Sequence, residues 1–280
     1  MHQLINTDCL DYLRHTEQVW TTIFADPPDN LNLKYANYKD NLSEEAYVRM
    51  LRDWLSTFVL HAKTVWFSFN AKWTFEMGKI ALDVVGLRAG DLEVKPCVQT
   101  FSFGQHRHDD LGNNHRPLWR FRWRDAPLLP DAIRVPSWRL LNGDKRADKR
   151  GRVPGDHFDV PRVTGNSKER RSWHPTQLGE RLVERCLKLT TPEGGTVLDP
   201  FAGTGTALRV CKRLNMPCTL IELDRTYCEK IADEHDLLYS ATDPHPMWTG
   251  LSQAAVASVL RGLEQAKAGL FAESPEHCHD

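Results

Sequence analysis

The sequence predicts an α/β fold with a mostly parallel, twisted sheet. Short apolar runs alternate along the chain with segments of helical periodicity, and strand, helix, strand in that order is a βαβ unit. Near the C-terminal end, another strand opens through a glycine-rich loop into a helix. With 280 residues, 41% of them hydrophobic, the chain can form one large domain or two small ones.

The N-terminal part supplies the first βαβ unit. QLI (3–5) is a strand, NTDC (6–9) is a polar turn before a short helix, and TTIFA (21–25) is a second strand. Two prolines end this strand, because proline cannot continue a hydrogen-bonded ladder. Ser43 caps a helix whose apolar residues recur at helical spacing as far as position 58. The helix leads into VWFSF (65–69), a run typical of a buried parallel strand.

PLWRFRWR (117–124) alternates strictly between aromatic and basic residues. Such alternation predicts a half-buried antiparallel strand, with the aromatic rings in the core and the arginines in solvent. Nucleic-acid binding by the interleaved arginines and rings is the alternative.

The C-terminal part predicts a second set of elements. HPTQLGERLVERCLKL (174–189) reads as a helix with Pro175 near its first turn. TVLD (196–199) and TLIELD (219–224) are strands on either side of the glycine loop and its helix. Further helices are expected at about 225–235 and 251–270.

Between residues 125 and 173 the periodicity disappears, and the segment is too long for an ordinary connection within a compact domain. We therefore expect an inserted functional segment there. Although the net charge is only −1, residues 139–171 are rich in lysine and arginine. They form either a phosphate-binding surface or a solvated, partly mobile loop.

Composition excludes several classes of protein. No apolar run approaches the roughly 20 residues of a membrane helix, and the N-terminus lacks a signal-peptide pattern, so we expect a cytoplasmic protein without a membrane partner. The seven cysteines are scattered without a CxxC pair, which argues against disulfides and a zinc site. HCH (277–279) is read as a frayed tail, and no metal is expected.

The loop in TVLDPFAGTGTAL (196–208) has the features of a ligand site. Gly203 and Gly205 allow close approach of the backbone, and the helix start favours anionic groups. Glu222 follows Asp199 by 23 residues, near the spacing at which an acid meets a ribose. A dehydrogenase would show GxGxxG directly after the strand, so a dinucleotide enzyme is disfavoured.

These motifs resemble those of a known family. DPFAGTGT (199–206) resembles the DPFxGxGT signature of S-adenosylmethionine-dependent amino-methyltransferases that act on DNA, and ADPPDN (25–30) is similar to their catalytic DPPY loop. The catalytic loop comes first, which is similar to the circularly permuted order of the β-class adenine-N6 and cytosine-N4 enzymes. The resemblance covers about residues 4–232 and implies a Rossmann-like methyltransferase fold with a small inserted target-recognition segment.

The implied organisation has four parts. Residues 1–124 would form the catalytic half of the methyltransferase domain and 174–237 its cofactor-binding half. Residues 125–173 would be the basic target-recognition insert, and 238–280 a C-terminal helical extension. That extension could pack on its own domain or on a second subunit, which leaves a homodimer open.

The resemblance also assigns a cofactor site for S-adenosyl-L-methionine. The turn with Asp8 and Cys9 would lie at its adenine, the alternative being a simple helix cap. Phe201 would pack against the cofactor, and Glu222 would bind its ribose hydroxyls. The methionine end would be held by the glycine loop and closed in by HPTQ. The residues involved are Asp199, Gly203, Thr204, Gly205 and Thr206, with His174 and Thr176 from HPTQ.

Catalysis is expected at the proline corner. The exocyclic amine of adenine is a poor nucleophile until acceptors hold its N–H groups, and the Asp26 carboxylate and the Pro27 carbonyl would do this, with Pro28 keeping the corner rigid. Asp29 departs from the family, which has an aromatic ring there to stack on the flipped base. Tyr35, Tyr38 or Trp66 would substitute for that ring.

The sequence therefore predicts an enzyme that methylates the N6 of adenine in a base flipped out of double-stranded DNA, with the basic insert gripping phosphates. The alternatives are a cytosine-N4 methyltransferase, or a catalytically weak or inactive protein that binds cofactor and DNA. A bacterial or phage-infected cytoplasm and a restriction-modification system are the expected setting.

Overall fold

A computed structural model describes residues 2–36, 38–86, 90–102 and 107–241. The helix expected at 251–270 and most of the proposed C-terminal extension lie outside the described residues. The strands are β1 (His2–Asn6), β2 (Trp20–Ala25), β3 (Ala62–Ser68), β4 (Leu92–Lys95), β5 (Val98–Thr100), β6 (His115–Trp123), β7 (His157–Asp159), β8 (Val197–Asp199), β9 (Cys218–Glu222) and β10 (Tyr239–Ala241). The α-helices are α1 (Cys9–Arg14), α2 (Glu44–His61), α3 (Thr74–Gly86), α4 (Trp138–Leu141), α5 (Glu180–Thr190), α6 (Thr206–Leu214) and α7 (Arg225–His235).

In the described residues the strands form one sheet in the order β10-β1-β9-β8-β2-β3-β6-β5-β7, with β4 beside β6. The strands from β10 to β3 are parallel, and β6 runs antiparallel to β3. The prediction of a mostly parallel sheet is confirmed. From β8 the chain proceeds toward β9, whereas from β2 it proceeds toward β3 on the other side, so β8 and β2 flank a topological switch point. Ligands bind at such a point, beyond the carboxyl ends of the strands.

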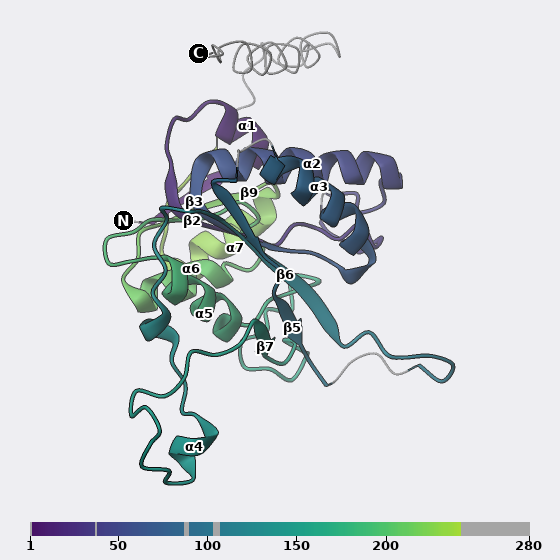
Figure 1. Ribbon diagram of the computed structural model, residues 1–280. Coiled ribbons are helices and arrows are strands. Elements are labelled where there is room, and N and C mark those ends of the chain that lie inside the picture. Colours follow the sequence, from purple (N-terminus) through teal and green to yellow (C-terminus); the bar gives the residue numbers. More distant parts are fainter. Residues whose placement is uncertain (1, 37, 87–89, 103–106, 242–280) are drawn as a thin grey trace, which may run out of the picture. The chain divides into compact units, whose positions relative to one another are not determined.

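Helices cover both faces of the sheet (Figure 1). The apolar stripes of α1, α2 and α3 pack on one face, around Leu51, Phe58 and Met77. Those of α5, α6 and α7 pack on the other, around Leu187 and Leu208. This two-sided cover explains why β2, β3 and β9 are almost continuous runs of buried residues.

Strand β6 departs from its predicted pattern. Its arginines do not lie on a solvated face, since Arg122 is buried and Arg120 lies over the ring of Trp66. The Arg122 guanidinium is accommodated because it donates to Glu93 at 2.6 Å and to the carbonyl of Ala126 at 2.6 Å. The alternation is that of a strand, but packing covers both of its faces.

Helix α5 begins at Glu180, not near Pro175 as predicted. The preceding residues form a loop held by side chains: the Gln177 amide accepts from the N–H of Arg171 and donates to the carbonyl of Glu169. The Glu169 carboxylate then accepts from the N–H of Glu180 and so caps the helix. The HPTQ segment is therefore a fixed loop and not a helical turn.

The segment 125–173 contains a short 3-10 helix (Pro130–Ile133), α4 and β7, and α4 projects away from the sheet (Figure 1). It is anchored where β7 pairs with β5 and where the N–H of Leu129 donates to the carbonyl of Leu189. At the end of the described residues, β10 pairs with β1, so the sheet continues past position 237 to Ala241. Of the helices described, none is long and apolar enough to cross a membrane.

Candidate active site

A cavity of about 1180 Å³ opens at the carboxyl ends of the parallel strands. Single-ligand pockets measure about 300 to 1,000 Å³, so this cavity has room for two ligands side by side. It is lined by all the predicted catalytic and cofactor-binding residues except Gly205. The lining includes Asp8, Cys9, Asp26, Pro27, Pro28, Asp29, His174, Thr176, Asp199, Phe201, Gly203, Thr204, Thr206 and Glu222.

The proline corner is fixed by two hydrogen bonds to its backbone. The carbonyl of Pro28 accepts from the Tyr47 hydroxyl at 2.6 Å, and the carbonyl of Asp29 accepts from the Trp73 indole at 2.9 Å. Tyr47 and Trp73 are both buried, with ring centroids 4.8 Å apart. The corner is therefore clamped from the α2 side of the core, which holds Asp26 and the carbonyl of Pro27 in one orientation.

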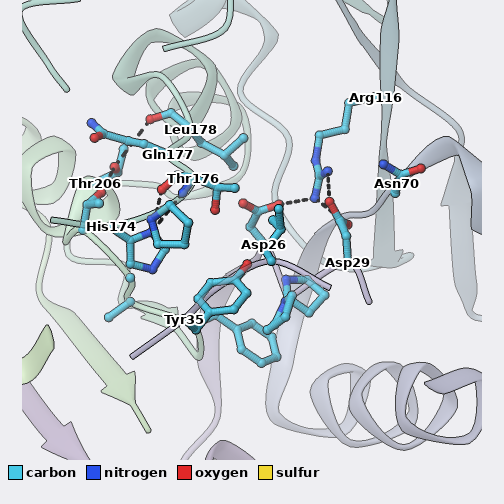
Figure 2. Close-up of a pocket in the computed structure, with 18 of the residues that line it drawn as sticks. Asp26, Asp29, Tyr35, Asn70, Arg116, His174, Thr176, Gln177, Leu178 and Thr206 are labelled. Atoms are coloured by element: carbon cyan, nitrogen blue, oxygen red, sulfur yellow. Dashed lines mark hydrogen bonds and ion pairs between the residues drawn. The ribbon is translucent and has the colours of Figure 1, made fainter. Parts of the chain in front are cut away.

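Arg116, at the start of β6, binds both acids of the corner (Figure 2). Its Nη1 and Nη2 donate to the two oxygens of Asp29 at 2.6 and 3.0 Å, and its Nη2 also donates to Oδ1 of Asp26 at 2.7 Å. Nε donates to the Ser68 hydroxyl at 2.6 Å. The three charged side chains are 12% to 27% exposed, so these interactions are largely shielded from water.

The electrostatics of this cluster follow from burial and charge together. Burial alone would lower the pKa of the Arg116 guanidinium, but the charges of Asp29 and Asp26 outweigh it and raise that pKa. Burial raises the pKa of the Asp29 carboxyl, and Arg116 opposes that shift. Arg116 therefore stays charged in the cavity wall.

Sequence reasoning missed Arg116. The sequence nevertheless contains an indication of its position. Arg116 immediately precedes PLWRFRWR and would lie on the same face of the strand as Arg120 and Arg122. Because β6 is antiparallel to β3, the start of β6 lies at the same edge of the sheet as the carboxyl end of β3. Extending the strand by two residues would have carried an arginine to the site.

The loop after the corner carries two tyrosines into the cavity. The Asp40 carboxylate accepts the N–H groups of Asn30, Leu31 and Leu33 at 2.8 to 3.0 Å, which ties the loop to itself. Tyr35 and Tyr38 line the cavity, and their rings meet edge to face with centroids 5.9 Å apart. These are two of the three rings proposed to stack on a base.

Trp66 is not a candidate for stacking. It is buried, does not line the cavity, packs edge to face on Phe158, and donates its indole N–H to Thr190 at 3.2 Å. Another ring, Phe75, lines the cavity and is 82% exposed. Nothing in the sequence distinguishes Phe75 from the other residues of the amphipathic helix α3 in which it lies.

The glycine loop leads from β8 into α6. Oδ1 of Asp199 accepts from the N–H of Phe201 at 3.0 Å. Gly203 has φ of +52°, and a Cβ added there would lie 3.4 Å from Nε2 of His174. Only glycine allows this left-handed turn without strain beside the imidazole. The phenyl ring of Phe201 packs edge to face on Trp54, with centroids 5.0 Å apart.

Arg209 braces the same loop from α6. Its Nη1 donates to the carbonyl of Thr204 at 2.7 Å and its Nη2 to the hydroxyl of Thr206 at 3.1 Å. Its Nε donates to Glu180 at 2.8 Å, and the hydroxyls of Thr204 and Thr206 lie 3.0 Å apart. The loop is held in place by contacts that the sequence pattern did not reveal.

Two buried carboxyls, Asp199 and Glu222, lie at adjacent strand ends. Glu222 accepts from the N–H of Gly203 at 2.8 Å and from that of Asp224 at 2.9 Å. Burial raises the pKa of both carboxyls to about 7. In the described part of the chain, neither forms an ion pair, so each can accept a polar or cationic ligand group.

Asp8 and His174 complete the wall. Oδ1 of Asp8 accepts from the N–H groups of Leu10 and Asp11 at 2.8 and 3.1 Å, so Asp8 is a helix cap as well as a lining residue. Burial lowers the pKa of His174, whose Nδ1 lies 2.6 Å from the carbonyl of Thr176. A neutral ring that donates from Nδ1 fits this geometry.

The cations of residues 139–171 are of two kinds. Several pair with nearby acids, as Arg146 does with Asp144 at 3.1 Å and Arg171 with Glu234. Others have no carboxylate partner within the described ranges, namely Arg139, Lys145, Lys149, Arg152, Arg162, Lys168 and Arg170. Nη1 of Arg170, a cavity-lining residue, is buried without a hydrogen-bond partner in the described structure.

Comparison with known sequences finds related enzymes. A family model described as DNA methylase matches residues 21–234. The type II methyltransferase M.HpaI of Haemophilus parainfluenzae is 28% identical over 253 residues, which cover 86% of this chain and 76% of that protein. The type II methyltransferase M.ScaI of Streptomyces caespitosus is 25% identical over 247 residues, which cover 81% and 78% of the two chains.

Solved structures share the fold. The PvuII DNA methyltransferase, described as cytosine-N4-specific, superposes with a TM-score of 0.63 at 12% identity and covers 93% of this chain and 91% of its own. The M1.HpyAVI–SAM complex gives a TM-score of 0.55 at 18% identity, with 84% and 100% covered. At these identities the likeness supports the fold.

Proposed function

Because the chain belongs to the DNA methylase family of adenine-N6 and cytosine-N4 enzymes, we propose that it methylates the N6 of adenine at a specific site in double-stranded DNA. The methyl donor of this family is S-adenosyl-L-methionine. The observation that carries the proposal is the position of Asp26 and Asp199, which end neighbouring strands on the two sides of the switch point and line one cavity. Cofactor and target base would therefore meet across a short distance.

The cavity wall fits the cofactor. The Asp199 carboxylate, which forms no ion pair within the described residues, suits its ammonium group, and Glu222 its ribose hydroxyls, as the resemblance implied. Nη1 of Arg170, which is buried and has no hydrogen-bond partner among the described residues, suits its carboxylate. Phe201 offers an aromatic edge to the adenine, with Asp8 and Cys9 beside it. The cofactor supplies an activated methyl group on a sulfonium.

The chain's own part in the reaction is to hold the amine. Two N–H groups of the target amine would donate to a carboxylate oxygen of Asp26 and to the carbonyl of Pro27, which directs the nitrogen lone pair at the methyl carbon. As the new carbon–nitrogen bond forms and the carbon–sulfur bond breaks, positive charge develops on the nitrogen. Asp26 stabilises that charge and accepts the proton that the nitrogen then loses.

Adenine is favoured over cytosine by the acid at position 26, since cytosine-N4 enzymes more often carry serine there. A carboxylate is a stronger acceptor than a hydroxyl for an amine that becomes cationic. Tyr35 is the proposed stacking ring, since it lines the same cavity as Asp26 (Figure 2).

DNA would be held mainly by charge. Apart from Arg170, the cations of residues 139–171 without a carboxylate partner in the described residues are proposed to bind phosphates, which positions the duplex without reading its sequence. The exposed ring of Phe75 at the cavity mouth is proposed to contact bases beside the flipped one. The type II methyltransferases among the relatives support a place in a restriction-modification system.

The test is transfer of label from radiolabelled S-adenosylmethionine to unmethylated DNA, followed by nucleoside digestion and mass spectrometry. We expect N6-methyladenine. N4-methylcytosine as the labelled base would overturn the choice of adenine but retain the family chemistry. Cofactor binding without transfer to any tested DNA would instead support a protein that binds cofactor and DNA but does not catalyse.

A further inference from the structure

We propose that Arg116 is a positioning residue for Asp26, and that Asp29 acts through Arg116 and not on the target base. This inference rests on the proposed function, in which Asp26 holds the amine. It explains why an acid stands where the family has a ring.

The first argument is the saturation of the guanidinium. Arginine has five N–H donors in one plane, and Arg116 uses four of them on Ser68, Asp29 and Asp26. The bidentate contact with Asp29 fixes the plane of the guanidinium, and the hydrogen bond to Ser68 fixes its Nε. Arg116 therefore cannot swing away to bind a phosphate without leaving several hydrogen bonds unmade.

The second argument is the orientation of Asp26. Arg116 binds only Oδ1 of Asp26, and within the described residues Oδ2 has no hydrogen-bond partner. Arg116 thus holds the carboxylate by one oxygen and leaves the other for the target amine. Since Asp26 follows a strand end and is 27% exposed, its side chain would otherwise be free to rotate.

The third argument is charge. Arg116 paired with Asp26 alone would neutralise the carboxylate that has to stabilise a developing cation. With Asp29 present, two carboxylates share one guanidinium. Two negative charges and one positive charge leave the cluster with a net charge of about −1. Asp29 therefore lets Arg116 orient Asp26 without cancelling its charge.

The experiment compares Arg116→Gln, Arg116→Lys, Asp29→Asn and the double variant Asp29→Asn/Arg116→Gln. For each we would measure kcat, KM for DNA, and Kd for S-adenosylmethionine by calorimetry. Arg116→Gln should lower kcat by about 100-fold, because misplacement of a catalytic group costs on the order of that factor. Kd for the cofactor should stay within about twofold of the native value. Arg116→Lys keeps the charge but loses the planar, forked guanidinium, so its kcat should lie between those of the native protein and Arg116→Gln.

The double variant decides how Asp29 acts. If Asp29 acts through Arg116, Asp29→Asn lowers kcat in the native background and costs nothing further once Arg116 is gone. Additive losses would overturn the inference, since Asp29 would then act independently. A rise in KM for DNA with unchanged kcat in Arg116→Gln would also overturn it and make Arg116 a DNA contact.

Arg122→Gln is the matched control. Arg122 lies on the same strand, is similarly buried, and pairs with Glu93, but it is not in the cavity wall. Each variant is compared at equal folded fraction, judged by thermal melting. If Arg122→Gln lowers kcat as much as Arg116→Gln, the effect is structural and the inference fails. If Arg116→Gln does not fold, Arg116→Lys and Asp29→Asn take its place. The inference then fails if Arg122→Gln lowers kcat as much as these two variants do.

Failure of the inference and failure of the proposed function give different results. A native protein that transfers no methyl group to adenine would refute the proposed function, whatever Arg116 does. An Asp26→Asn variant with full activity would refute the role of Asp26 on which this inference rests. An inactive Asp26→Asn together with a fully active Arg116→Gln would refute only the positioning role.

Discussion

At the residue scale, the acids of the cavity fall into two groups. Asp199 and Glu222 are buried at the ends of β8 and β9 with no ion-pair partner in the described residues, and they face the proposed cofactor site. Asp26 and Asp29 share Arg116 and face the proposed base site. Substitutions in the two groups should therefore separate binding from catalysis.

Asp26→Asn should abolish methyl transfer and leave cofactor binding intact. The amide keeps the size of the side chain but loses the charge that stabilises the aminium and the capacity to accept its proton, so kcat should fall by at least about 100-fold. Single-turnover transfer and calorimetric Kd for the cofactor are the two measurements. A parallel loss of cofactor affinity would place Asp26 in the cofactor site instead.

Gly203→Ala should weaken cofactor binding and destabilise the fold. Its φ of +52° costs a residue with a Cβ about 1 to 2 kcal/mol, and the methyl would meet His174 at 3.4 Å. Thermal melting and cofactor Kd measure the two effects. Gly90→Ala is a control with φ of +80° and open space around it, so it should show the melting change without the change in Kd.

At the element scale, six of the ten described strands and five of the seven described α-helices could be predicted because their signals are local. The strands not predicted are β4, β5, β7 and β10, and the helices not predicted are α3 and α4. The apolar runs of β2, β3 and β9 and the periodicity of α2 lie in consecutive residues, and the helix expected at 225–235 has the bounds of α7. The predicted start of α5 near Pro175 was wrong, because the side chains of Gln177 and Glu169 hold the preceding residues in a loop. Such contacts have no periodic signature.

The residues of the candidate site could likewise be predicted where they are close together in the sequence, and not where distant segments bring them together. Motif residues adjoining one strand end, such as those at 199–206, could be read from the sequence. Arg116 was missed, because its partner Asp29 is 87 positions away and the antiparallel pairing of β6 with β3 brings them together. The covered arginine face of β6 was missed for the same reason, since burial depends on β4 and on neighbouring loops.

The loop that carries Tyr35 and Tyr38 is an element that a single side chain organises. Asp40→Ala would leave the N–H groups of Asn30, Leu31 and Leu33 without their acceptor. We expect methyl transfer to fall by about tenfold or more through misplaced rings, with little change in cofactor affinity. Limited proteolysis should cut within 30–42 sooner than in the native protein.

Asp40→Asn is the matched control for the loop. Its amide retains one acceptor oxygen of the two that Asp40 uses, so activity and protease resistance should lie between those of the native protein and Asp40→Ala. Equal activity of Asp40→Ala and the native protein would mean that neither tyrosine needs this loop geometry to act on the base.

At the scale of the whole molecule, the sheet concentrates buried acids at one edge, and this makes stability depend on pH and cofactor together. Burial raises the pKa of Asp199 and of Glu222 to about 7, above the value near 4 of an unfolded chain. Between these values the folded protein holds protons that the unfolded chain has lost. Their contribution to stability is therefore present at low pH and is lost as pH rises through about 7.

The cofactor should reverse this loss, because its ammonium group favours the ionised form of Asp199. A carboxyl with a pKa of about 7 is about 9% ionised at pH 6.0 and about 76% ionised at pH 7.5, so affinity should rise up to about eightfold between them. The cofactor-induced rise in Tm should likewise be larger at pH 7.5 than at pH 6.0. Differential scanning fluorimetry with and without S-adenosylmethionine measures it.

Asp199→Asn separates this effect from other titrating groups, His174 among them. The amide cannot ionise, so the variant should bind the cofactor weakly and lose most of the pH dependence of the Tm shift. A native Tm shift that is the same at both pH values, or a variant that keeps the full dependence, would mean that Asp199 does not meet the ammonium. The cofactor's methionine end would then lie against another part of the glycine loop, and the direction in which the methyl group faces Asp26 would have to be revised with it.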